Sequence, residues 1–147
     1  MSTQPTTPPA RSPLGDLRAV RPHQATTLAV AMSVAHRQAA LLREILAIHG
    51  KAISLERITR LPGVTVTVIN DLPVPGTAFW GNGHWNIHVR QQDPPETQRF
   101  NVLHELKHII DHPGRRAATA DDARLSDADE ELVADHFATC VLTGEAA

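Results

Sequence analysis

Two histidines and a glutamate at fixed spacing are the clearest chemical feature of the sequence. They form His104-Glu105-Leu106-Lys107-His108, the pattern HExxH. If this segment is helical, His104 and His108 lie about 40° apart on one face, because each residue turns the helix by about 100°. Two imidazoles so placed can bind one Zn²⁺. Glu105 lies about 100° round from His104, where it can reach a water in the site but cannot be a third ligand on that face.

The apolar residues around the motif support a helix. They lie on the side opposite to the histidines, which is the side that a core helix buries, and are Leu103, Leu106, Ile109 and Ile110. A face that carries histidine and charge is costly to bury unless its groups are paired or bind a metal. We therefore interpret His104 and His108 as zinc ligands rather than as two incidental histidines on an exposed helix.

A catalytic zinc usually has three protein ligands, so one more must come from elsewhere. The extension HExxHxxGxxH is excluded, because this chain has neither its glycine nor its last histidine. A later predicted helix offers Glu131 and Asp135, which share a face at i and i+4. Glu131 can bind the metal while Asp135 accepts the other N–H of a ligand histidine. Glu130 can compete with Glu131, although it points about 100° away.

The elements that must hold these residues follow from hydrophobic periodicity and from turn residues. Gly81, Asn82 and Gly83 favour a tight hairpin between two strands, because they tolerate positive φ angles. The segment His112-Pro113-Gly114 is expected to end the motif helix. The predicted elements are helices 28–49, capped by Gly50, and 54–61, strands 64–69, 77–80 and 84–90, and helices 96–111 and 129–142.

This order of elements predicts the α+β fold class. We expect helices packed on a small, mostly antiparallel sheet, with the HExxH helix followed by the ligand helix. Residues 1–27 hold five of the eleven prolines and few apolar residues, so they are predicted to be a disordered Pro/Thr-rich tail. Residues 28–147 are predicted to form a single domain.

The composition excludes several classes of protein. The 147 residues carry 14 Lys+Arg against 16 Asp+Glu, which provides no basic footprint for nucleic acid or an anionic membrane. No apolar run approaches the roughly 20 residues needed to span a bilayer. Cys140 is the single cysteine, so no internal disulfide can form. We expect a cytoplasmic protein that binds neither nucleic acid nor membranes directly.

The chain has nine histidines and no tyrosine. The absence of tyrosine removes a common phenolic group that could stabilise an oxyanion, so another side chain must supply this help. The candidates are an arginine or one of His136, His112 and His84.

The hairpin strands at 78–80 and 85–87 can form a cleft edge that binds extended substrate by β-addition. Alternatively, their aromatic residues fill the core.

Two segments together resemble the ImmA/IrrE metallopeptidases. The first is Arg99-Phe100-Asn101-Val102-Leu103 leading into the HExxH motif, and the second is Glu131-x-x-Ala134-Asp135-x-Phe137-Ala138. The resemblance covers about residues 35–143. It implies a gluzincin-like fold, one zinc ion bound by His104, His108 and Glu131, and Glu105 as general base. It also implies that substrates are often helix-turn-helix repressors of phage, mobile-element or stress-response genes.

The chain departs from the family pattern in two places. Lys107 stands where a glycine is common, and it either extends its head to solvent or crowds the cleft. The final helix ends at 142–145 without the apolar stretch and proline with which the family often continues.

The sequence thus favours a zinc metallo-endopeptidase that hydrolyses a partner protein, expected to be a helix-turn-helix regulator. The alternative is a zinc-stabilised, non-catalytic binding module that sequesters a repressor or an antitoxin-like partner. The intact Glu105 favours the enzyme over the binding module.

Overall fold

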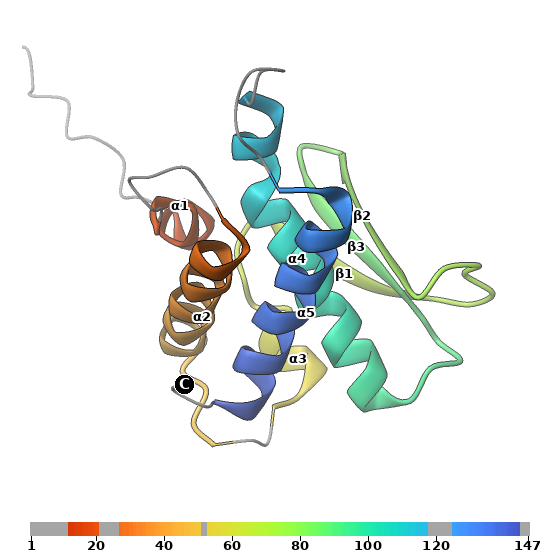
Figure 1. Cartoon of the computed structure of the whole chain (residues 1–147). Helices are drawn as coiled ribbons and strands as arrows, with labels where there is room; N and C mark the ends of the chain where they lie inside the picture. Colours follow the sequence, from red (N-terminus) through yellow and green to blue (C-terminus); the bar gives the residue numbers. More distant parts are fainter. Residues whose placement is uncertain (1–11, 21–26, 51–52, 118–124, 145–147) are drawn as a thin grey trace, which may run out of the picture.

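The computed structural model describes residues 12–20, 27–50, 53–117 and 125–144, with only the backbone described for 113–117. Five helices and one three-stranded sheet make up this part of the chain (Figure 1), which confirms the α+β class. The elements are α1 Pro13–Ala19, α2 Leu28–Ile45, α3 Leu55–Ile58, β1 Val64–Ile69, β2 Gly76–Gly81, β3 His84–Arg90, α4 Pro95–Ala117 and α5 Asp127–Thr143.

The sheet has the order β1-β3-β2 and is mixed, not mostly antiparallel as predicted. Strands β2 and β3 form the expected antiparallel hairpin, with positive φ angles of 55° at Asn82 and 78° at Gly83 that suit a two-residue turn. After β1 the chain crosses to the far edge of the sheet to form β2, and β3 then returns between them, so β1 pairs with β3 in parallel. This leaves β2 at one edge of the sheet.

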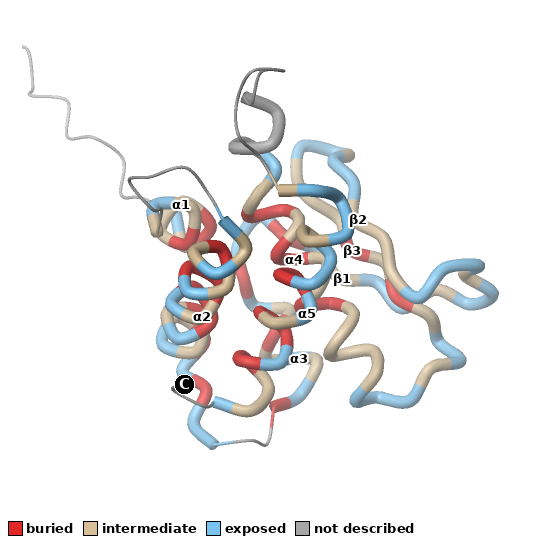
Figure 2. The backbone as a smooth tube through the Cα atoms, viewed as in Figure 1, coloured by how far each residue is buried: buried red, intermediate tan, exposed pale blue. Residues whose placement is uncertain are grey.

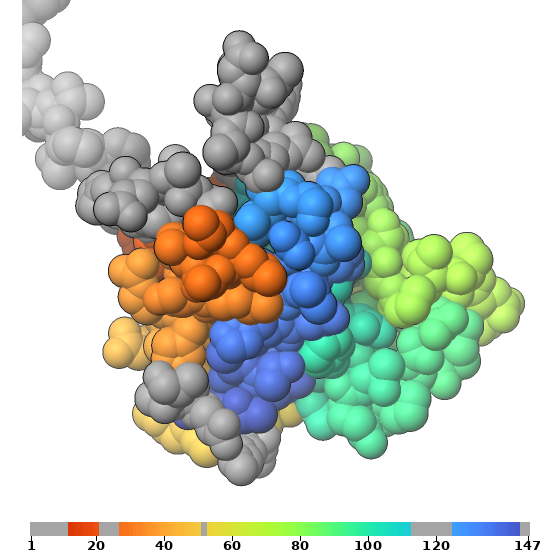
Figure 3. Space-filling model, viewed as in Figure 1, coloured from red at the N-terminus to blue at the C-terminus, as the bar shows by residue number. Residues whose placement is uncertain are grey.

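The core forms where α4 packs against both α5 and the strands β2 and β3. In Figure 2 the buried parts of the helices and of β3 face one another, and in Figure 3 α5 lies between α2 and the strands on one face of the molecule. The largest fully buried side chains come from α1, α2, β3, α4 and α5, and they include Leu17, Leu42, Ile87, Leu103, Leu106, Ile109 and Phe137. Within the described residues, no helix is both long and apolar enough to cross a membrane.

The prediction of a disordered tail over residues 1–27 is wrong for residues 13–19, which form α1. Ser12 caps this helix by accepting a hydrogen bond from the Gly15 N–H, and Pro13 occupies its first turn. Leu14 and Leu17 are buried where α1 packs against α2 and α4. Their burial supplies the free energy that orders the segment. Residues 1–11 and 21–26, the rest of the predicted tail before Thr27, lie outside the described residues.

Helix α2 ends at Ile45, four residues before the predicted end at His49. The left-handed position that closes the helix is taken by Ala47, with φ 53°, and not by the predicted cap Gly50. The Ile48 N–H donates to the Arg43 carbonyl at 2.8 Å, as in a Schellman motif. Because this turn also buries Ile48, tertiary packing outweighs the cost of a left-handed alanine.

Helix α4 continues to Ala117, so the prediction that residues 112–114 end it is wrong. Pro113 has no N–H and therefore leaves the carbonyl of Ile109 without its helical partner. Arg18 on α1 donates a hydrogen bond from Nη2 to this same carbonyl oxygen at 2.8 Å. A residue 91 positions away in sequence thus replaces the bond that the proline removes.

This replacement predicts an interaction between two distant substitutions. Arg18→Met is expected to lower the free energy of unfolding by about 1–2 kcal/mol, because the Ile109 carbonyl loses its donor. In a Pro113→Ala background, the alanine N–H can bond this carbonyl, so the cost of Arg18→Met is expected to be smaller. Urea unfolding of the wild type, the two single variants and the double variant measures the cost of Arg18→Met in both backgrounds. Equal costs in the two backgrounds would show that Arg18 does not compensate for Pro113.

Candidate metal centre

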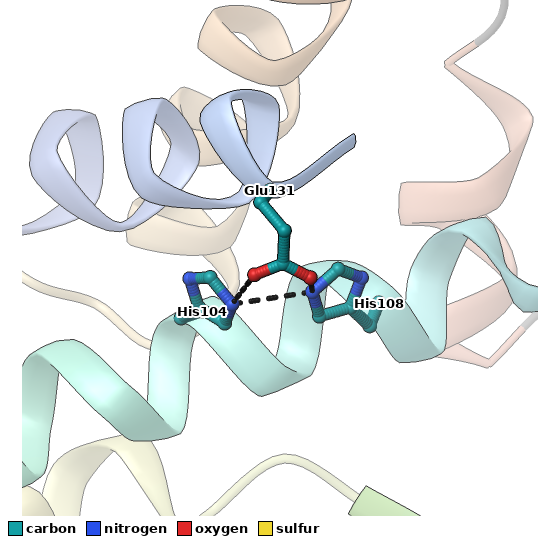
Figure 4. Close-up of side chains that lie close together, drawn as sticks. All are labelled: His104, His108 and Glu131. Carbon is teal, nitrogen blue, oxygen red and sulfur yellow. Dashed lines mark hydrogen bonds and ion pairs between the residues drawn. The ribbon is translucent and has the colours of Figure 1, made fainter. Parts of the chain in front are cut away.

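The structure brings together two histidines of α4 and one glutamate of α5 (Figure 4). His104 Nε2 lies 2.9 Å from one carboxylate oxygen of Glu131, and His108 Nε2 lies 3.0 Å from the other. The two Nε2 atoms are 3.2 Å apart. Of the two acidic neighbours at the start of α5, Glu131 and not Glu130 belongs to this cluster.

The spacing of these three donors fits a tetrahedral zinc ion. Bonds of 2.0–2.1 Å from a zinc ion place neighbouring ligand atoms about 3.3 Å apart. The separations of 2.9 to 3.2 Å in the cluster are close to this value. The Glu131 side chain is 59% exposed, so the cluster is open to solvent on one side. The donor set of two imidazoles and one carboxylate leaves room for a water or a substrate oxygen as fourth ligand.

Asp135 lies one turn after Glu131 on α5 and contacts the far side of His104. Its Oδ1 accepts a hydrogen bond from His104 Nδ1 at 2.7 Å. This bond places the imidazole proton on Nδ1, so the lone pair on Nε2 points toward Glu131 and His108. The geometry agrees with the orienting role expected for Asp135.

Glu105 lies beside the two histidines and against the first residue of β2. A Cβ atom added at Gly76 would come within 3.3 Å of Glu105 Cγ, so a glycine lets the strand approach the helix this closely. Burial raises the pKa of Glu105 above its usual range, whereas His108 and His104 lower it and Glu131 raises it. A raised pKa makes the carboxylate a better proton acceptor near neutral pH. Sequence analysis missed the contact of Gly76, for which a glycine at the start of a strand is the only local sign.

The raised pKa of Glu105 predicts a pH-dependent effect of Glu105→Gln on stability. The folded pKa lies above the unfolded one, so the stability given by the protonated carboxyl is lost as the pH rises through the folded pKa. In metal-free protein near neutral pH, Glu105→Gln is therefore expected to raise Tm by about 1–3 °C. This gain should shrink as the pH approaches about 4.

Thermal unfolding in a chelating buffer over this pH range measures the gain. The control is Glu56→Gln, because the Glu56 side chain is 82% exposed and the charge change is the same. A Glu105→Gln protein that is less stable than wild type near neutral pH would contradict the prediction.

A family model described as the IrrE N-terminal-like domain, Peptidase M78, matches residues 62–147. The chain belongs to this family. No curated protein and no solved structure matches the chain. The family match confirms the resemblance noted in the sequence. It covers the sheet, α4 and α5, which carry the candidate metal centre, and begins after α1, α2 and α3.

Lys107 of this Peptidase M78 domain neither extends to solvent nor crowds the cleft, so both sequence-based expectations are wrong. It is 3% exposed, and its side chain reaches α2. Its Nζ donates to Gln38 Oε1 at 2.7 Å and to Asp111 Oδ1 at 2.6 Å. Gln38 Nε2 in turn donates to the Leu17 carbonyl at 3.0 Å. Lys107 thus joins α4 to α2 and α1 through a buried polar chain.

The three histidines considered as oxyanion helpers lie in different places. His136 Nε2 is 3.6 Å from Cys140 Sγ, on the same helix, and His84 Nδ1 is 3.0 Å from the Asn82 carbonyl in the hairpin turn. His112 is exposed and lies one turn beyond His108 on α4, with its ring against Trp85. Of these three, His112 alone lies on α4, on the same side of the helix as His104 and His108.

Proposed function

We propose that this protein is a zinc-dependent endopeptidase that hydrolyses a peptide bond in a partner protein. The observation that carries the proposal is the placement of Glu105 beside a cluster of two imidazoles and one carboxylate, in a chain of a peptidase family. His104, His108 and Glu131 would hold the ion, and Asp135 would fix the tautomer of His104.

A bound zinc ion would polarise the scissile carbonyl and make a water molecule more acidic. Glu105 accepts the proton of the attacking water and then donates it to the nitrogen of the leaving amine. Its raised pKa suits both steps, because the carboxyl group must take and release one proton near neutral pH. Of the three histidines, His112 is the candidate for a cleft residue, since it lies one turn beyond His108 on the side of α4 that carries the metal ligands.

The position of strand β2 favours a substrate that binds in an extended conformation. In the described part of the chain, β2 pairs with β3 on one side and with no strand on the other. Its first residue, Gly76, lies against Glu105, and the Pro75 carbonyl accepts a hydrogen bond from Asn101 Nδ2 at 3.4 Å. A peptide added to the free edge of β2 would pass the metal cluster and place a backbone carbonyl there.

Asp135→Asn is expected to weaken zinc binding by about 10–100-fold, because the hydrogen bond that orients His104 is lost. Competition with a chromogenic chelator measures the affinity. Asp129→Asn makes the same charge change earlier on α5 and provides the control. Equal affinity in the wild type and Asp135→Asn would contradict an orienting role for Asp135.

We propose a helix-turn-helix transcriptional repressor as the substrate and the cytoplasm as the compartment. This proposal rests on the family, for which the resemblance implies regulators of phage, mobile-element or stress-response genes. The regulator encoded nearest to this gene is the first to test.

The test incubates that regulator with zinc-loaded wild type and with Glu105→Gln. Mass spectrometry detects fragments and locates the cleaved bond, and a DNA-binding assay follows the regulator. Fragments with the wild type alone support the enzyme. Loss of DNA binding with both proteins while the regulator stays intact would overturn the proposal in favour of a sequestering module.

A further inference from the structure

Two tryptophans of the hairpin lie on the face of the sheet that meets α4, one exposed and the other half-buried. Trp80, near the end of the edge strand β2, is 62% exposed. Its ring makes an edge-to-face contact with Trp85 of β3 at 5.6 Å between centroids. Trp85 makes a similar contact with His112 of α4 at 5.0 Å. Trp80, Trp85 and His112 form one continuous surface, named here the aromatic wall.

The register of the hairpin places both tryptophans on the face of the sheet that meets α4. Trp80 is directly opposite Trp85, and directly paired residues share a face. Trp85 also contacts His112, which identifies this face as the one toward α4. Phe79, the neighbour of Trp80, lies on the other face, where its ring contacts His88. The expectation that these aromatic residues fill the core is wrong for Trp80 and Phe79, which are 62% and 42% exposed.

The wall continues the surface along which an extended substrate would lie. Strand β2 starts at Gly76, against Glu105, and reaches Trp80 four residues later. On α4, His112 lies one turn, about 6 Å, beyond the candidate ligand His108. Four residues of extended strand cover about 13 Å, and alternate side chains point to the same side. A peptide paired along β2 from Gly76 would therefore bring one of its side chains to the wall, on one side of the cleaved bond.

We propose that the aromatic wall is a specificity subsite that takes a bulky apolar side chain of the substrate, on one side of the cleaved bond. The inference rests on the proposed peptidase function and adds a preference among substrates. Covering the exposed Trp80 ring with an apolar side chain favours binding, because apolar surface of both partners is then removed from water. A subsite that holds one large apolar side chain is expected to discriminate by about 10–200-fold against a small one.

The protein itself supplies a selective probe of this surface. Trp80 and Trp85 are its two tryptophans, and it has no tyrosine, so its intrinsic fluorescence reports on the wall. The experiment uses the full-length, zinc-loaded Glu105→Gln protein, which is expected to bind peptides and to hydrolyse them too slowly to disturb the measurement. The probes are blocked peptides of equal length and charge, with leucine, phenylalanine or glycine at each position in turn.

We expect peptides with leucine or phenylalanine at one position to bind at least about tenfold tighter than their glycine counterparts, and to shift the tryptophan emission to the blue. Trp80→Ala removes an exposed ring and leaves Trp85 as reporter. It is expected to reduce the preference to less than about threefold. Phe79→Ala, on the other face of the same strand, is the matched control and should keep the preference.

Equal affinity for the apolar and glycine peptides, or absence of binding by every peptide, would overturn the subsite. So would an unchanged preference in Trp80→Ala. The proposed function has a separate readout, which is hydrolysis by the zinc-loaded wild type. Cleavage without side-chain preference would refute the wall alone, whereas a preference in binding without any cleavage would refute the peptidase and leave the wall as a peptide-binding surface.

Discussion

Replacing Glu105 by glutamine is expected to lower the rate of peptide hydrolysis by about 10²–10⁴-fold. Glutamine has nearly the shape of glutamate but cannot accept the proton of the attacking water. Glu105 is not part of the donor cluster of His104, His108 and Glu131, so zinc content should not change. The expected result is thus a protein that holds its metal and has lost its activity.

The measurement combines single-turnover cleavage of the regulator with metal analysis of the same sample. Glu96→Gln is the matched control, because Glu96 is exposed in the first turn of the same helix and undergoes the same charge change. It should cleave at the wild-type rate. If Glu105→Gln cleaves as fast as wild type, then Glu105 is not the general base and another group must take the proton.

Replacing Glu131 by glutamine is expected to weaken zinc binding by at least about 100-fold and to abolish hydrolysis with it. The substitution removes the negative charge that faces both imidazoles at 2.9 and 3.0 Å. A neutral amide is a much poorer zinc ligand than a carboxylate. Two histidines alone do not complete a catalytic site, which usually has three protein ligands.

Zinc content after dialysis and competition with a chelator measure this loss. Glu130→Gln changes the same charge at the adjacent position, outside the donor cluster, and should retain zinc. Undiminished zinc in Glu131→Gln would exclude Glu131 as a ligand. Loss of zinc in Glu130→Gln alone would assign the ligand to that neighbour instead.

The helix that carries the candidate metal centre depends on elements ahead of the family match. Arg18 of α1 bonds the Ile109 carbonyl, one residue after His108. Lys107, one residue before His108, is held by Gln38 of α2. These two contacts join the part of α4 around His108 to α1 and α2. We therefore regard α1 and α2 as part of the structural support of the metal centre.

The pattern of residues along the chain was sufficient to predict which side chains the fold brings together in the candidate metal centre. HExxH on an amphipathic helix places two imidazoles on one face, and Glu131 and Asp135 share a face at i and i+4, whatever surrounds them. The hairpin at Asn82-Gly83 is equally local, because positive φ angles at both positions suit one kind of turn. Features set by helical or strand periodicity need no knowledge of distant residues.

Other features depend on contacts between residues far apart in sequence, and these only the tertiary structure decided. Helix α4 continues through Pro113 because Arg18 bonds the carbonyl that the proline leaves free. Lys107 is buried because Gln38 and Asp111 accept its hydrogen bonds. The parallel pairing of β1 with β3 depends on where the chain crosses the sheet. In each case the result depends on a residue or strand that only the packing of the whole chain brings into contact. Local sequence preferences therefore cannot predict it.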